Sequence, residues 1–131
     1  MGRYWSVDPG SAVRVLIVDD QQPFRAVARE VVEAAGDFSV VGEAQDGETS
    51  VTMARELHPD LVLMDVNLPG IDGVEATRRI LAESGDTKVL LLSTYEEDEY
   101  ADRASECGAL AYIPKAAFDP ERLAGVWAAA T

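Results

Sequence analysis

Five side chains that could share one reaction lie directly after apolar stretches of the sequence. Asp19 and Asp20 follow VRVLIV, Asp65 ends LVLMD, Ser93 ends KVLLLS, and Lys115 follows ALAYIP. Short apolar runs of this kind predict strands that are buried on both faces of a parallel sheet. Open parallel sheets bind their ligands at the carboxyl ends of the strands. We therefore expect the five side chains to meet in one pocket.

The types of these side chains favour phosphoryl transfer assisted by a divalent cation. Three carboxylates and one ammonium carry a formal charge of about −2, which such a cation would neutralise. Oxygen ligands with room for water favour Mg²⁺. One carboxylate could then attack phosphorus and form an acyl phosphate, while the metal, the amine and the hydroxyl neutralise the phosphoryl oxygens.

The rest of the sequence predicts the elements that would position these groups. Strands are predicted over residues 13–18, 38–44, 61–65, 88–93 and 109–113. Helices are predicted from Pro23 to the stop signal Gly36, from the cap Asp46 to Leu57, over 74–84, from the acidic cluster Glu96–Glu99 to Cys107, and after the cap Asp119 and Pro120. This alternation predicts a three-layer α/β fold with a doubly wound parallel (βα)5 sheet in the strand order 2-1-3-4-5.

Length and composition indicate a single domain. We expect residues 1–12 to form a poorly ordered N-terminal arm and residues 13–131 to form the domain. The formal net charge of −13 argues against direct nucleic-acid binding by this chain, because phosphates are held by clustered Lys and Arg. The lone Cys107 cannot form an internal disulfide and should be a small buried residue. With no evident signal peptide or membrane span, we expect a cytoplasmic protein.

Taken together and in this order, the residues resemble the receiver domain of two-component response regulators, from Val13 to about Trp127. The resemblance implies the flavodoxin-like version of the predicted fold. It also implies a phosphoacceptor switch that catalyses only its own phosphorylation and dephosphorylation, with a sensor histidine kinase as phosphoryl donor. In this role Asp65 would be the phosphoacceptor.

The resemblance also assigns a role to each of the other pocket residues. Asp20, Asp65 and the backbone carbonyl of Asn67 would bind Mg²⁺ directly, and Asp19 would act mainly through coordinated water. Lys115 would pair with a phosphoryl oxygen. By the same analogy, Asn67 and Tyr95 would flank the approach of the water that hydrolyses the acyl phosphate, and the bulk of Tyr95 predicts a longer-lived phosphorylated state than in Tyr95→Ala.

The switch itself is assigned to two residues by the same resemblance. Ser93 would swing toward the phosphoryl group, and Tyr112 would turn inward when that hydroxyl moves; the alternative for Tyr112 is a half-buried aromatic on the last strand. The output surface would be the fourth helix, fifth strand and fifth helix, with Trp127 either on that surface or packing the last helix onto the sheet. The kinase would dock near Phe24 and Val27 of the first predicted helix and near the loop after Lys115.

The sequence leaves two alternatives for the output of the switch. Ala116 follows Lys115, where many receivers have proline, and this form resembles the branch that carries a helix-turn-helix DNA-binding domain. The sequence stops at Thr131, soon after the fifth predicted helix. Because it starts at Met1 without an evident tag and fades out in Ala128–Ala130, we favour a stand-alone receiver that contacts a downstream protein over the receiver portion of a DNA-binding transcriptional regulator. A phosphorylation-dependent homodimer is also left open.

Three rival functions agree less well with the same residues. A Mg²⁺-dependent phosphatase of the haloacid dehalogenase type needs an acid two residues after its nucleophile, where this chain has Asn67. A flavin-binding module would place a phosphate beside Asp19 and Asp20, which would repel it. A receiver-like protein that has lost phosphorylation is disfavoured by the intact acids, Ser93 and Lys115.

Overall fold

The computed structural model describes residues 12–94 and 101–131, and these residues form a five-stranded parallel sheet flanked by helices. The elements are β1 (Val13–Val18), α1 (Gln22–Ala34), β2 (Phe38–Ala44), α2 (Gly47–Leu57), β3 (Leu61–Asp65), α3 (Gly73–Glu83), β4 (Lys88–Ser93), α4 (Ala101–Glu106), β5 (Ala111–Pro114), a 3-10 turn (Lys115–Ala117) and α5 (Pro120–Ala130). The strand order is β2-β1-β3-β4-β5, and every pairing is parallel. The predicted three-layer α/β fold is therefore confirmed.

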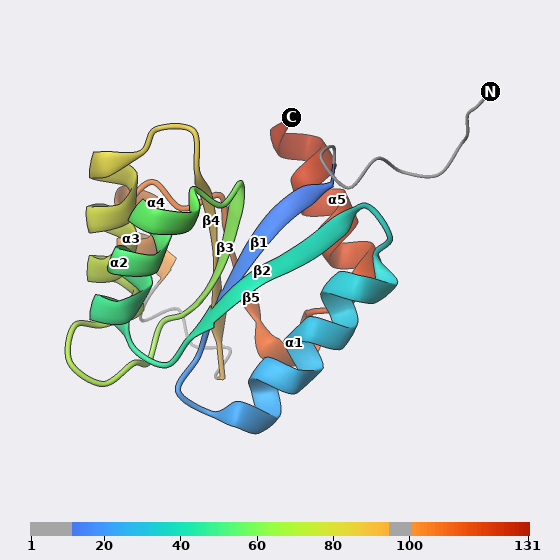
Figure 1. Cartoon of the computed structure of the whole chain (residues 1–131), viewed down its shortest axis with the longest axis horizontal. Coiled ribbons are helices and arrows are strands. Elements are labelled where there is room, and N and C mark those ends of the chain that lie inside the picture. Colours follow the sequence, from blue (N-terminus) through green and yellow to red (C-terminus); the bar gives the residue numbers. More distant parts are fainter. Residues whose placement is uncertain (1–11, 95–100) are drawn as a thin grey trace.

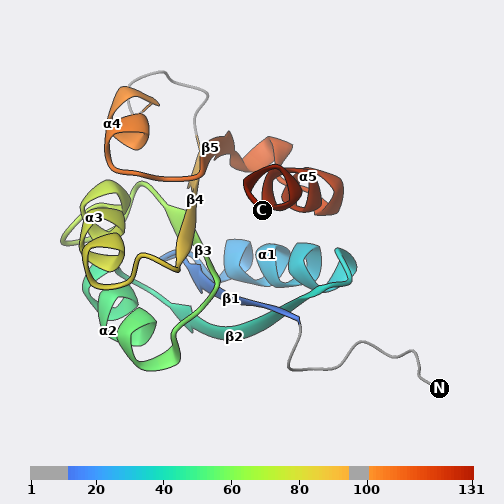
Figure 2. The ribbon, with the colours of Figure 1, turned by 90° about the horizontal axis from the view of Figure 1, so that it is seen from above.

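Helices cover both faces of the sheet (Figures 1 and 2). Helices α1 and α5 lie on one face, and α2, α3 and α4 lie on the other. Strand side chains alternate between the two faces, so one core cluster joins Ile17 and Leu63 to α1 and α5, and the other joins Val18 and Met64 to α2 and α3. Because β3 is buried along its whole length, Asp65 is the last residue of a strand that is covered on both faces.

The helix starts follow from side-chain caps that the sequence predicts. Asp46, Asp72 and Asp119 each lie just before a helix and accept a hydrogen bond from the backbone N–H three residues later. Such a bond satisfies one of the N–H groups that have no partner inside the helix. Since α3 begins directly after the loop that leaves Asp65, its cap also fixes the far end of that loop.

Some predicted boundaries differ from those observed. The last strand runs from Ala111 to Pro114 and not from Ala109 to Ile113, because Gly108, with a φ of +92°, ends the preceding helix and the chain needs two further residues to rejoin the sheet. The acidic cluster Glu96–Glu99, at which the predicted fourth helix begins, lies outside the described residues. Within them, α4 spans Ala101–Glu106. Residues 1–11 of the predicted arm also lie outside the described residues.

Two predicted packing roles can be compared with the structure. Cys107 is 8% exposed and belongs to the core cluster on the α2–α3 face, which confirms the prediction for this residue. Trp127 is partly buried and packs edge-to-face on Phe38, with ring centroids 6.3 Å apart. This contact supports the packing alternative for Trp127.

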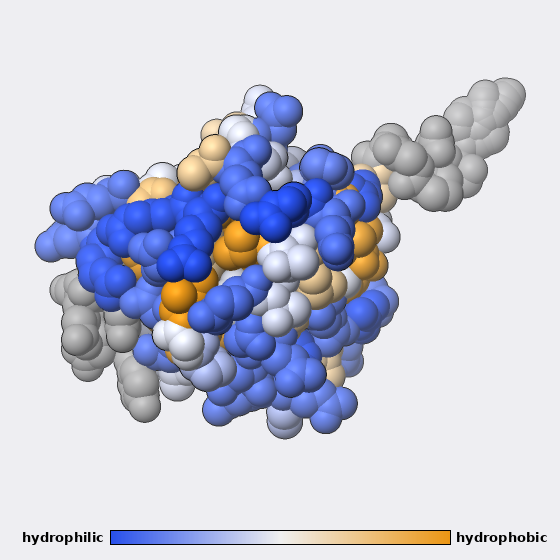
Figure 3. Space-filling view, turned by 60° about the vertical axis from the view of Figure 1, so that its left-hand side comes forward, coloured by the Kyte–Doolittle hydropathy of each residue, from blue (hydrophilic) through white to orange (hydrophobic). Residues whose placement is uncertain are grey.

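The surface is mainly hydrophilic where α2 and α3 face outward, with small hydrophobic areas between the polar side chains (Figure 3). Among the described residues, Val27 on α1 is the large hydrophobic side chain that stands exposed, at 47%. None of the helices in the described ranges has the length and apolar character needed to cross a membrane.

Candidate functional site

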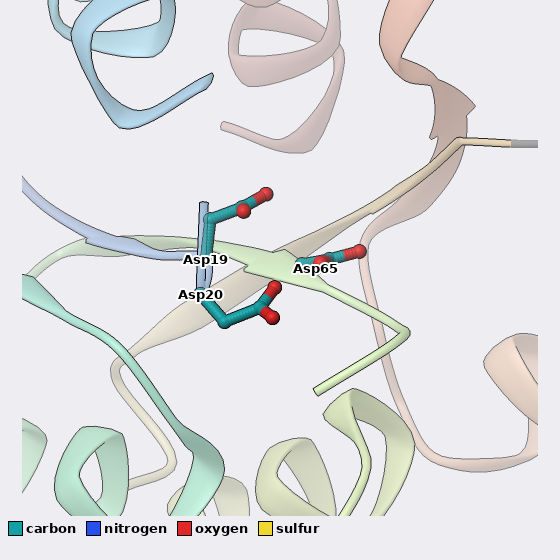
Figure 4. A group of neighbouring side chains, drawn as sticks. All are labelled: Asp19, Asp20 and Asp65. Atoms are coloured by element: carbon teal, nitrogen blue, oxygen red, sulfur yellow. The ribbon is translucent and has the colours of Figure 1, made fainter. Parts of the chain in front are cut away.

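Three carboxylates meet at the carboxyl ends of β1 and β3. Asp19 and Asp20 follow β1, and Asp65 ends β3, which lies beside β1 in the sheet. One carboxylate oxygen from each residue lies within 4.8 Å of the other two, and Figure 4 shows the three side chains leaving neighbouring strand ends. Asp19 and Asp65 are buried, whereas Asp20 is exposed. The predicted convergence of these three acids is therefore observed.

Lys115, which directly follows the edge strand β5, brings an ammonium group to the three carboxylates. Its ammonium nitrogen Nζ lies 2.6 Å from Oδ2 of Asp19 and 3.6 Å from Oδ2 of Asp65. The Lys115 side chain is only 13% exposed, and Nζ lies 4.4 Å from the centre of the Phe24 ring. One cation thus faces three anions, two of which are buried, so a net negative charge is left in the site.

Backbone N–H groups hold two of the three carboxylates in place. The N–H of Gln21 donates to Oδ1 of Asp19 at 2.8 Å, and the N–H of Asn67 donates to Oδ1 of Asp65 at 3.2 Å. Each acid is therefore oriented by the chain two residues after it, as the strand turns into the following loop. The orientation comes from the loops themselves and needs no partner molecule.

The surroundings raise the pKa of Asp65 from 3.8 to about 6. Burial is the main cause, and the neighbouring charge of Asp19 adds to it. Lys115 and the N–H of Asn67 act in the opposite direction, since both stabilise the ionised carboxylate. Asp65 is thus poised to be ionised at neutral pH but remains poorly neutralised.

The pocket has the size and the chemistry for a hydrated divalent cation. It has a volume of about 320 Å³ and is lined by Asp20, Gln21, Asp65, Asn67, Thr94 and Lys115. Asp19 adds a buried oxygen, Oδ2, which contacts Lys115 without forming an aligned hydrogen bond. Carboxylate oxygens are the hard ligands that Mg²⁺ prefers, and the volume leaves room for several waters. The donor set therefore fits Mg²⁺.

The predicted switch residues, Ser93 and Tyr112, do not line this pocket. Ser93 ends β4, is 1% exposed, and stands opposite Pro114 of β5 in the sheet register. Tyr112 of β5 is half-buried and packs against the core cluster on the α2–α3 face. Tyr95, which was predicted to flank the approach of water, lies outside the described residues.

The structure also brings residues to the site that sequence reasoning did not assign there. Thr94 lines the pocket, and its position directly after Ser93 was a signal that could have found it. Phe24 was assigned only to kinase docking, yet its ring contacts Lys115. Arg25 donates to the backbone carbonyl of Asp19 at 2.8 Å, a contact for which the sequence contains no signal.

The fold and the pocket together define a flavodoxin-like α/β domain with an acidic site that attracts cations. The family model described as the response regulator receiver domain matches residues 15–126, so the chain belongs to this family. The resemblance predicted from the sequence is confirmed. Receivers are phosphoacceptor switches of two-component systems and not enzymes with turnover, and membership implies a histidine kinase as partner.

Relatives of known name agree with this assignment. The chain is 44% identical over 105 residues to the response regulator GacA of Pseudomonas viridiflava and 41% identical over 103 residues to the transcriptional regulatory protein LiaR of Bacillus subtilis. These alignments cover 80% and 79% of this chain and 49% of each relative. The chain therefore spans about half the length of the curated relatives it matches.

Solved structures show the same fold. A two-component response regulator of the LuxR family from Aurantimonas sp. SI85-9A1 has a TM-score of 0.82 at 35% identity, covering 91% of this chain and 84% of that chain. The response regulator domain of Thermotoga maritima CheB has a TM-score of 0.80 at 31% identity, covering 89% and 95%. Both likenesses extend over nearly the whole of the described domain.

Proposed function

We propose that Asp65 accepts a phosphoryl group from a phosphorylated histidine of a sensor kinase, in a reaction that requires Mg²⁺. The observation that carries this proposal is the meeting of three carboxylates from two strand ends with the ammonium of Lys115, 2.6 Å from Asp19 and 3.6 Å from Asp65. Oxygens of Asp20 and Asp65 and the backbone carbonyl of Asn67 would bind the metal, with Asp19 acting mainly through water.

In the proposed reaction the ionised carboxylate of Asp65 attacks phosphorus. A bond forms between a carboxylate oxygen and phosphorus, and the bond between phosphorus and the histidine nitrogen breaks, leaving its electron pair on that nitrogen. Mg²⁺, when bound, would neutralise charge on the phosphoryl oxygens. Lys115 would bind one of these oxygens, so its contact with Asp65 would be replaced by a contact with the product.

The phosphorylated state would act through Ser93 and Tyr112. A phosphoryl group adds negative charge and strong acceptor oxygens at the strand ends, and the Ser93 hydroxyl would donate to one of them. Movement of Ser93 would vacate space at the end of β4, and Tyr112 would turn inward from β5. Both changes would bias an equilibrium between two arrangements of the α4-β5-α5 face that exists before phosphorylation.

The partners follow from this mechanism. A sensor histidine kinase would dock near Phe24 and Val27 on α1, and the phosphorylated α4-β5-α5 face would contact a downstream protein, a second copy of the chain or an output domain. The alignments with the two relatives cover only 49% of each, and one of them is a transcriptional regulatory protein, so phosphorylation-controlled transcription is the output to test first, through DNA-binding residues outside these 131. We place the protein in the cytoplasm, where such kinases present their phosphohistidine.

Labelling with a small phosphodonor tests the proposal. Acetyl phosphate and Mg²⁺ should add one phosphoryl group to the protein, as measured by intact mass, and chelation of Mg²⁺ should prevent it. Asp65→Asn should not be labelled. The matched control is Asp37→Asn, because Asp37 is an exposed carboxylate just before β2, at the opposite edge of the sheet. Labelling of Asp65→Asn to the level of the parent would refute the assignment.

A further inference from the structure

The loop that carries Asp19 and Asp20 is held by a charged side chain that the proposed reaction does not use. Arg25 lies in the first turn of α1, and its side chain is 11% exposed. Its Nη1 donates to the backbone carbonyl of Asp19 at 2.8 Å, and its Nε donates to Oε1 of Glu43 at 3.1 Å. Arg25 therefore ties the end of β1 to β2 through a helix.

Glu43 is itself fixed in position. It lies in β2, in register with Ile17 of β1, and its second oxygen accepts hydrogen bonds from Nε of Arg29 at 3.0 Å and from Nη2 at 2.5 Å. Two arginines one turn apart on α1 thus share a single carboxylate. Only Arg25 also reaches Asp19, so Arg29 provides a matched control for Arg25.

The carbonyl that Arg25 holds belongs to the peptide group joining Asp19 to Asp20. Because a peptide group is planar, the direction of this carbonyl also sets the direction in which Asp20 leaves the strand. Within residues 12–94 and 101–131, no side chain or N–H donates a hydrogen bond to the exposed carboxylate of Asp20. The backbone therefore directs Asp20 toward Asp65, and Arg25 is a side chain that fixes this part of the backbone.

We propose that Arg25 is a positioning residue for the metal site: its guanidinium bridges the Asp19 carbonyl and the Glu43 carboxylate and so keeps Asp20 aligned with Asp65. The inference rests on the proposed function, since it takes Mg²⁺ as the ligand shared by Asp20 and Asp65. Arginine suits the role because its planar, five-donor head can contact a carbonyl and a carboxylate at once. A lysine keeps the charge but concentrates its donors on one nitrogen.

Calorimetric titration of the whole chain with Mg²⁺, at a temperature where every variant is folded, tests the inference. Substitution of a residue that orients a metal ligand without touching the metal typically weakens metal binding by roughly tenfold or more. We therefore expect Arg25→Gln to raise the Mg²⁺ Kd about tenfold. Arg25→Lys should also weaken binding, and Arg29→Gln should leave the Kd unchanged. In the metal-free protein, the Asp20 amide resonance should move in Arg25→Gln and stay in place in Arg29→Gln.

A merely structural role would give a different result. It would lower the melting temperature of Arg25→Gln while leaving its Mg²⁺ Kd and its Asp20 amide resonance as in the parent, and this outcome would overturn the inference. Full recovery of the Kd in Arg25→Lys would also overturn it, because charge and not geometry would then suffice. If Arg25→Gln does not fold, Glu43→Gln loosens the same contact, and a Kd equal to that of the parent decides against the inference.

The parent and Asp65→Asn separate this inference from the proposed function. If the parent fails to bind Mg²⁺, the metal site and the role of Arg25 are both wrong. If the parent binds, Asp65→Asn loses affinity and Arg25→Gln binds as tightly as the parent, only the role of Arg25 is wrong.

Discussion

Removing the charge of Asp65 should stabilise the protein in the absence of Mg²⁺. The pocket raises the pKa of Asp65 from 3.8 to about 6, chiefly through burial and also through the charge of Asp19. A tenfold change in an ionisation constant corresponds to about 1.4 kcal/mol, so ionising Asp65 destabilises the folded state by at most about 3 kcal/mol. Asparagine has a similar shape and no charge. Allowing for imperfect hydrogen bonding of the new amide, we expect Asp65→Asn to increase the free energy of unfolding by about 1–2 kcal/mol.

The pH dependence of this effect has a definite sign. Between about pH 4 and about pH 6 the folded protein keeps a proton on Asp65 that the unfolded chain has released, so the contribution of Asp65 to stability falls as the pH rises through this window. Asparagine does not titrate. The advantage of Asp65→Asn should therefore be full above about pH 6 and should disappear near pH 4, where both states of the parent are protonated.

Urea unfolding of the parent and of Asp65→Asn, with a chelator present to remove Mg²⁺ and across this pH range, measures the difference in their free energies of unfolding. For a domain of this size, thermal unfolding near neutral pH should show a rise in Tm of about 4–8 °C. Asp37→Asn, which removes an exposed carboxylate, controls for the change in net charge. The reasoning is refuted if Asp65→Asn is no more stable than the parent near neutral pH, or if its advantage persists unchanged near pH 4.

Addition of Mg²⁺ should narrow or reverse the difference between the two proteins. A ligand that binds only the folded state stabilises it in proportion to the logarithm of its concentration over Kd. The parent should gain this stabilisation, whereas Asp65→Asn lacks one of the carboxylates that would hold the metal. Equal stabilisation of both proteins by Mg²⁺ would show that the cation binds elsewhere.

Two further substitutions test how the site is built. A Cβ at Gly73 would lie 2.1 Å from the backbone oxygen of Asp65, so Gly73→Ala should destabilise the fold by about 1–3 kcal/mol and weaken Mg²⁺ binding, as measured by urea unfolding and calorimetry. Phe24→Leu removes the ring that lies 4.4 Å from Nζ of Lys115; losing about 1 kcal/mol of cation–π attraction should slow labelling by acetyl phosphate about fivefold.

Each of these substitutions has a control in the same chain. A Cβ at Gly125, inside α5, would meet no atom within 4 Å, so Gly125→Ala should stabilise the protein by about 0.5–1 kcal/mol through helix propensity. If both alanine variants are equally stable, close approach at Gly73 is not a constraint. Val27→Ala alters an exposed position on α1 and should leave labelling unchanged; an equal loss of rate in Phe24→Leu and Val27→Ala would argue against a role for the ring.

The sequence predicted the sheet well because its signal is local. The strands predicted over 13–18, 38–44 and 88–93 agree with β1, β2 and β4 residue by residue. Each is a short run of mainly apolar or β-branched residues between turn signals, so the hydrophobic period marks its ends. Strand order then placed Asp19, Asp20 and Asp65 together, since strand ends in a parallel sheet share one edge.

The contacts that adjust the site could not be predicted in the same way. The bond from Arg25 to the Asp19 carbonyl depends on which side of β2 the helix α1 crosses and on the rotamer of a long side chain. The ring of Phe24 on α1 lies beside Lys115, which begins the 3-10 turn after β5, although the two residues are far apart in the chain. Such contacts join segments far apart in the chain, and neither residue type nor spacing specifies them.

The buried charge of Asp65 and the contacts that hold the loops around it act together. The buried strand β3 denies Asp65 the water that would stabilise its charge, while Lys115 neutralises only part of the acidic group. A cation would relieve the negative charge imbalance that the fold maintains, whereas a phosphoryl group would add to it, so either one would change the relative energies of loop arrangements at the strand ends. Contacts that only hold the loop, such as the one from Arg25 to Asp19, keep that imbalance from relaxing by movement of the backbone. Stability lost at Asp65 and responsiveness gained there should therefore vary together across variants of this pocket.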